Sequence, residues 1–221
     1  MPRESFAQEL EALQGEMMVL GSMTERAIVR AVEALKARDQ EAARQIIADD
    51  ALINRKRFEI EEACIQMIAT QQPMASDLRT IIAILHIIVD LERMADHAGG
   101  IARITLLVGD KPHLKPLIDI PRMAELGVGM LRRSLDAFLR RDAETARAIC
   151  VEDDAVDALY DQVYRELLTY MLGDPSTIDR ATHLLWAAHN LERIADRVTN
   201  LCERVIYLVT GKMEEINVST Y

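Results

Sequence analysis

Residues that interrupt helices or cross-link chains are scarce in this sequence. Only six prolines occur in 221 residues, and no run rich in β-branched residues shows the strict alternation that is typical of a strand. There are three cysteines, an odd number without a close pair in the sequence, which argues against a disulfide framework and a thiolate metal site. We therefore expect an all-α protein that folds in a reducing compartment, the cytoplasm.

Long apolar stretches and excess positive charge are also missing. The longest apolar run, residues 81–89, is interrupted by His86 and has about half the roughly 20 residues that a membrane-spanning helix needs. A formal charge of −10 disfavours nucleic acid and anionic lipid, because phosphate groups attract the opposite charge. We expect neither a nucleic-acid partner nor direct membrane insertion, and the amino terminus lacks the pattern of a secretory signal.

One sequence motif, Leu-Glu-Arg-x-Ala-Asp, occurs at residues 91–96 and again at residues 191–196. Two other features repeat in the same order: an aspartate suited to cap a helix, Asp39 and Asp142, and a proline-containing break at residues 71–73 and 173–175. Each half therefore predicts three helices. The expected helices span residues 5–36, 40–70, 76–108, 121–139, 143–171 and 176–211. We predict two tandem three-helix bundles, residues 1–110 and 121–214, joined by a proline-containing linker at residues 111–120.

Acidic residues spaced four apart share one face of each motif helix. Such like-charged pairs oppose helix formation by roughly 0.2–0.5 kcal/mol, which raises the question of what cation offsets them. In the first half, the pair is Glu92 and Asp96, at the border of the apolar face. The second half carries a longer strip, which comprises His189, Glu192, Asp196, Asn200 and Glu203.

The preceding helix of each half supplies a second acidic strip. Aligning the two capping aspartates pairs Asp50 with Asp153 and Asn54 with Asp157. Oxygen ligands from two helices can surround a hard cation such as magnesium, manganese, calcium or iron, and the signatures of thiolate or poly-histidine zinc sites are absent. For one isolated copy, a solvated acidic face with Arg93 pairing with Asp96 is the better explanation. Recurrence in both halves favours metal binding.

Three stretches of the chain, residues 64–79, 90–97 and 190–200, resemble the PhoU family of cytoplasmic regulators associated with bacterial phosphate transport. The resemblance covers residues 6–211 and includes both copies of the motif. It implies paired three-helix bundles that bind a multinuclear metal on Glu-x-x-x-Asp motifs. Iron is the metal that the resemblance favours, with manganese, magnesium and zinc as alternatives. The matching residues are Glu92, Asp96, Glu192 and Asp196.

The same resemblance implies a protein without enzymatic activity. It implies a homodimer that couples the ATP-binding subunit of a phosphate transporter to a phosphate sensor histidine kinase, and that negatively regulates phosphate uptake and the starvation response. The chain departs from the family pattern in its first repeat. Gly100 and Arg103 stand where the second repeat has Asn200 and Glu203, so we expect the first metal site to be the weaker one.

The competing hypothesis is a metal-dependent enzyme or a metal store built from a carboxylate helical bundle. The acidic strips favour it, whereas the absence of the Glu-x-x-His pairs of di-iron bundles opposes it. No nucleophile elbow or glycine-rich phosphate loop occurs. Trp186 and the methionines at helical spacing are expected to fill the core.

Overall fold

The computed structural model describes residues 2–213, and every regular element in this range is a helix. No helix among these residues has the length and apolar character needed to cross a membrane. The prediction of an all-α chain with six long helices is confirmed. The elements are α1 (Pro2–Ala37), α2 (Gln40–Gln71), α3 (Ala75–Val108), α4 (Asp119–Arg140), α5 (Ala143–Gly173), the short 3-10 helix η1 (Pro175–Thr177) and α6 (Ile178–Thr210).

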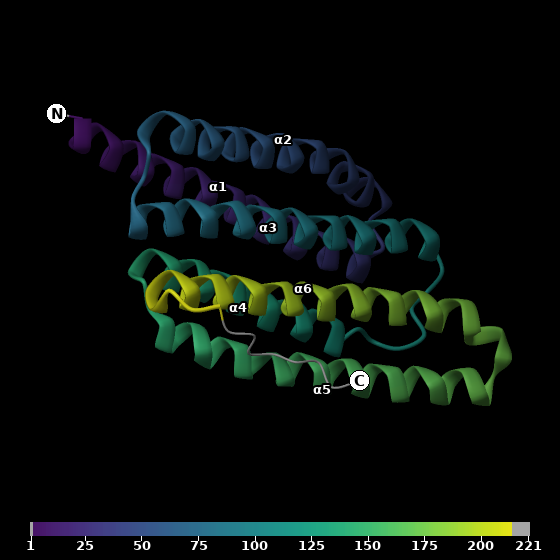
Figure 1. The fold of residues 1–221 in the computed structure, drawn as a ribbon. Helices are drawn as coiled ribbons and strands as arrows, with labels where there is room; N and C mark the ends of the chain where they lie inside the picture. The colour runs from purple at the N-terminus through teal and green to yellow at the C-terminus, as the bar shows by residue number, and fades with distance from the viewer. Residues whose placement is uncertain (1, 214–221) are drawn as a thin grey trace.

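The helices form two antiparallel three-helix bundles, α1–α3 and α4–α6, stacked along their length (Figure 1). α3 packs against α6 at the centre of the molecule, and α1 packs against α4. α2 and α5 lie on opposite outer sides (Figure 1). One continuous apolar core runs through both bundles. The two helices that carry the repeated motif are therefore the two innermost helices.

The helix boundaries repeat because the residues that set them repeat. Asp39 accepts hydrogen bonds from two backbone N–H groups in the first turn of α2, and Asp142 accepts one from Thr145 in α5. The residue before each cap, Arg38 or Arg141, adopts a left-handed conformation, with φ of 59° and 54°. The two bundles therefore make the same turn at the same point, and both predicted caps are confirmed.

The helix α4 begins at Asp119, two residues before the predicted start at Pro121, so residues 109–118 connect α3 to α4. The first four N–H groups of a helix have no partner inside it, so a proline in the first turn removes no helical hydrogen bond. Proline in this sequence therefore marks the first turn of α4 and not its first residue.

One contact between side chains distant in the sequence was not predicted, and the expectation that Trp186 fills the core is wrong. Cys150 and Cys202 lie far apart in the sequence, but both are buried, and their thiols are hydrogen-bonded to each other between α5 and α6. They are nevertheless free thiols. Trp186 is half-exposed and lies beside His183, with 5.9 Å between the ring centroids. Helical spacing predicts which residues share a face, but it does not tell whether another helix covers that face.

Candidate metal centre

The predicted acidic strips meet in pairs, one pair in each bundle. The motif helix α3 presents Glu92 and Asp96 to Asp50 of α2, and α6 presents its carboxylates to those of α5. We call Asp50, Glu92 and Asp96 the first cluster. The second cluster consists of Asp153, Asp157, Glu192 and Asp196.

The first cluster holds a buried carboxylate oxygen that forms no hydrogen bond. Asp50 Oδ2 accepts a hydrogen bond of 3.0 Å from Asn54 Nδ2, whereas Oδ1 has no hydrogen-bond partner. Burial raises the pKa of Asp50, and the nearby Asp96 raises it further. The guanidinium of Arg103 acts in the opposite direction.

Arginines offset much of the negative charge of the first cluster. Burial and Asp96 raise the pKa of Glu92, while Arg93 and Arg57 lower it. Arg93 also donates a 3.3 Å hydrogen bond to Asp96, as the three-residue spacing predicted. In the second repeat, Tyr160 and Glu203 occupy the positions of Arg57 and Arg103. The repeats thus place similar carboxylates in different electrostatic surroundings.

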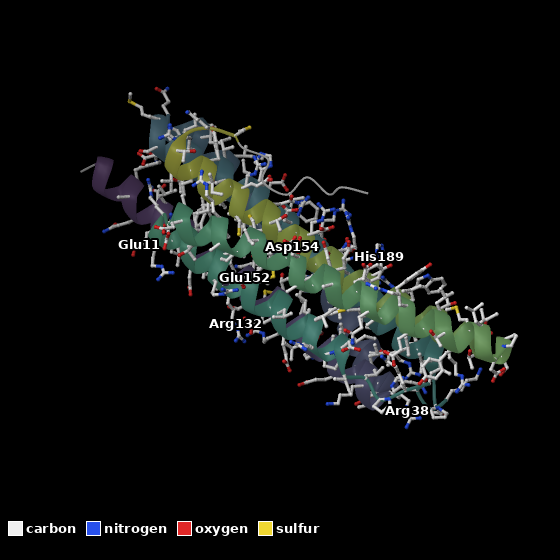
Figure 2. All side chains as sticks on the ribbon, turned by 90° about the horizontal axis from the view of Figure 1, so that it is seen from below. Glu11, Arg38, Arg132, Glu152, Asp154 and His189 are labelled. Atoms are coloured by element: carbon white, nitrogen blue, oxygen red, sulfur yellow. The ribbon has the colours of Figure 1, made fainter. Side chains whose placement is uncertain are left out.

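Two carboxylates of the second cluster, Asp153 and Glu192, are buried, whereas Asp196 is partly buried and Asp157 is exposed. Glu192 is only 8% exposed, and its Oε2 forms no hydrogen bond although it lies 3.3 Å from Nδ1 of His189. Burial, and then the charge of Asp196, raises the pKa of Glu192 to about 7. Arg193 lowers this pKa and donates a 2.7 Å hydrogen bond to Asp196. Figure 2 views the molecule from the α5 side and labels Asp154 of α5 and His189 of α6, which adjoin Asp153 and Glu192 respectively.

The pKa of Asp153 shows the strongest effect of the neighbouring carboxylates. It is 1% exposed, and burial, followed by the charges of Asp157, Asp196 and Glu192, raises its pKa to about 7. Burial also raises the pKa of Asp157, with Asp196 the next cause. Because carboxylates of like charge repel each other, this cluster favours either a proton or a cation among its oxygens.

The donor set fits a hard cation, but the side chains are not arranged to hold one. No three histidine, cysteine, aspartate or glutamate side chains of residues 2–213 form a group that could hold a metal ion. Arg193 pairs with Asp196, but Oε2 of Glu192 accepts no hydrogen bond and the pKa values of Asp153 and Glu192 remain raised, so negative charge exceeds positive charge in the second cluster. Carboxylate oxygens are the preferred ligands of such cations. The four carboxylates could coordinate an ion after side-chain rotation.

Two predicted ligands make other contacts. Asn200 Nδ2 donates a hydrogen bond of 3.2 Å to Asp90 of α3, so this side chain is directed toward the first bundle. Glu203 lies beside Arg204, with 3.7 Å between Oε2 and Nη2, and close to Cys150. His189 adjoins Glu192 as predicted, with its ring 5.9 Å from that of Tyr160.

A set of polar contacts between α3 and α6, which sequence reasoning missed, joins the two bundles. Asp90 is 9% exposed and accepts hydrogen bonds of 3.2 Å from both Arg197 and Asn200. A second contact between α3 and α6 joins His97 and Asn190, with 3.0 Å between His97 Nδ1 and Asn190 Oδ1. Asn190 Nδ2 donates to a backbone carbonyl, so its Oδ1 accepts the hydrogen bond from His97.

The contact of Asn190 with α3 also explains why residue 100, the second of two adjacent glycines in α3, has no side chain. A Cβ atom added to Gly100 would lie 2.7 Å from Oδ1 of Asn190, closer than real Cβ contacts. Asn190 lies one hundred positions after Asp90, as Asn200 does after Gly100. The repeat alignment could therefore have indicated this interface, because it pairs polar residues on one face of both motif helices.

Comparison with known proteins agrees with the fold and the duplication. The PhoU domain matches residues 17–105 and 120–205. The chain is 40% identical over 218 residues to the "Phosphate-specific transport system accessory protein PhoU homolog" of Clostridium acetobutylicum, which covers 98% of this chain and 100% of that protein. It is 41% identical to the protein of the same name from Aquifex aeolicus, with 93% of each chain covered.

Solved structures support the same relationship. The crystal structure of the phosphate transport system regulatory protein PhoU from Streptococcus pneumoniae superposes with a TM-score of 0.89 at 33% identity, covering 95% of this chain and 99% of that one. PhoU from Pseudomonas aeruginosa gives a TM-score of 0.89 at 36% identity, covering 94% and 100%. From both repeats, the fold and these relatives, we conclude that the chain belongs to the PhoU family, which consists of regulatory accessory proteins and not of enzymes.

Proposed function

We propose that this protein regulates phosphate transport from the cytoplasm as a homodimer. It couples the ATP-binding subunit of a phosphate-specific transporter to a phosphate sensor histidine kinase, and restrains uptake and the starvation response when phosphate is plentiful. The observation that carries the role in phosphate transport is full-length similarity to proteins named for the phosphate-specific transport system. The partners, the negative direction of control and the dimer rest on the family resemblance.

A strain that lacks the protein tests this role. We expect it to overproduce phosphate-starvation enzymes in phosphate-rich medium, because the kinase is no longer restrained. The assay is the activity of a starvation-induced phosphatase, with and without a plasmid that restores the gene. Normal repression in the deletion strain would refute the proposed direction of control.

We also propose that the second cluster binds a hard metal ion, iron being the one favoured by resemblance. Asp153, Asp157, Glu192 and Asp196 would hold it, and the ion would supply positive charge to the crowded carboxylates. The observation that favours this cluster over the first is electrostatic. Arg57 and Arg103 offset the charge of Glu92 and Asp50, whereas the second repeat has Tyr160 and Glu203 at those positions.

Metal content after paired substitutions tests the difference between the clusters. Replacing Glu192 and Asp196 by alanine should remove most of the bound metal, whereas replacing Glu92 and Asp96 by alanine should remove little. Elemental analysis of the purified proteins measures the metal, and circular dichroism verifies that both variants are folded. Equal loss in the two variants, or none in either, would contradict an unequal pair of sites.

A further inference from the structure

A groove of about 630 Å³ lies between the amino-terminal part of α1 and the carboxy-terminal half of α2. None of the residues that line it belongs to either acidic cluster. Three buried side chains, Leu13, Ile60 and Met67, form its apolar lining, each with less than a tenth of its surface exposed. Glu9 and Glu59 are among the polar side chains around them. The groove thus combines an apolar floor with an acidic rim.

The second bundle shows how the same place is filled by the chain itself. α1 has 36 residues, whereas its counterpart in the second bundle, α4, has only 22. The second bundle therefore has no helix that corresponds to the first turns of α1, and the linker occupies that place. There, the side chain of Lys115 is only 9% exposed, and it forms ion pairs with Asp119 and Glu166. The alignment that superposes the two capping aspartates pairs Lys115 with Ala12 and Glu166 with Ala63.

Two alanines therefore leave open, in the first bundle, a place that a buried lysine and a glutamate occupy in the second. Ala12 and Ala63 both line the groove and are exposed. An alanine side chain ends at Cβ, so neither residue can reach across the space between α1 and α2. The groove stays open because alanines stand in the first repeat where the second repeat has a lysine and a glutamate.

The charges around the groove indicate what would complement it. Lys56 forms ion pairs with both Glu16 and Glu59, so one cation is shared between two carboxylates. Glu9 adds a third carboxylate to the rim. The lining therefore carries excess negative charge beside apolar surface. Lys115 in the second bundle shows that an amine on a long aliphatic stem suits such surroundings.

We propose that this groove binds a basic amphipathic helix of a partner protein. The apolar face of that helix covers Leu13, Ile60 and Met67, and one of its lysines or arginines reaches the carboxylates of the rim. This mode of binding lays an apolar helix face into a groove and uses charge to select the partner. The proposal does not depend on the metal or on the signalling role.

The test uses a variant that fills the groove without changing the net charge. Ala12→Lys combined with Ala63→Glu reproduces the ion pair that Lys115 forms with Glu166. The probe is a fluorescent amphipathic leucine–lysine peptide of about 14 residues, long enough to form a helix when bound. We expect fluorescence anisotropy to show binding to the unaltered protein and about tenfold or greater weakening for the filled variant.

Two controls separate the groove from general attraction between opposite charges. Ala48→Lys combined with Ala51→Glu places the same charges on exposed positions of α2 outside the groove, and it should leave peptide binding unchanged. A leucine–glutamate peptide of the same length should not bind. Circular dichroism of all variants verifies the fold. The proposal is overturned if the leucine–lysine peptide does not bind, or if it binds the filled variant as tightly as the unaltered protein.

Discussion

Replacing Asp153 by asparagine should stabilise the metal-free protein, by about 4 kcal/mol above roughly pH 8 and by about 1.5 kcal/mol near pH 5. The pKa of this carboxyl is about 7 in the folded protein, compared with about 3.9 in an unfolded chain. Between these values the folded state binds the proton and the unfolded state does not. Stability of the unaltered protein therefore falls as pH rises from about 4 to 7, and asparagine removes this loss.

Urea unfolding followed by circular dichroism in the presence of a chelator measures the effect at each pH. Asp154→Asn is the matched control, because Asp154 is the next residue of α5 and is exposed. It should change the free energy of unfolding by no more than about 0.5 kcal/mol. The same pH dependence in Asp153→Asn as in the unaltered protein would show that burial of this carboxyl has no such cost.

Replacing Arg197 by methionine should lower the free energy of unfolding by about 2–3 kcal/mol. Methionine keeps the aliphatic stem but leaves the carboxylate of Asp90 without its cationic partner. The side chain of Asp90, taken by itself, is 13% exposed. Burial raises the pKa of Asp90, and Asn200 and Arg197 oppose that shift. The side chain of Arg197 is 30% exposed, so we place the loss below the 3–5 kcal/mol typical of fully buried pairs.

A double-mutant cycle separates this interaction from the loss of the arginine itself. Asp90→Asn combined with Arg197→Met should recover part of the stability, because the unpaired buried charge is removed. Arg165→Met is the surface control, since Arg165 and Asp161 are 74% and 67% exposed, and it should cost less than about 0.5 kcal/mol. A loss from Arg197→Met no larger than this control would rule out a stabilising role for the bridge.

Most of the fold was predictable because its signals are local. Asp39 and Asp142 cap their helices, and the proline-containing breaks end α2 and α5 close to the expected residues. The error at Pro121 is also local, since proline is accepted anywhere in the first turn. The assignment of Trp186 to the core failed because burial depends on which helix lies opposite, and spacing along one helix carries no information about that.

The sequence predicted which carboxylates come together in the candidate site, but it did not predict all of the side chains that contact them. Spacing of four residues placed Glu92 with Asp96 and Glu192 with Asp196, and the duplication brought Asp50 and Asp153 into the same argument. Asn200 also lies at that spacing, yet its amide contacts Asp90 in the other bundle. A residue at the edge of a helical strip can turn toward either neighbouring helix, and its own helix does not determine which.

Local signals in the sequence were thus sufficient to establish six helices, their duplication and the acidic faces of α3 and α6. Capping residues and proline-containing breaks delimit the helices, the repeated motif shows the duplication, and the 3.6-residue period places the acidic residues on one face. Packing between helices set the rest. Packing joins the two bundles through Asp90 and Arg197 and places Cys150 beside Cys202. It also places Arg57 and Arg103 near the carboxylates of the first cluster. Electrostatic surroundings arise from residues remote in the chain, so two nearly identical motifs became unequal sites.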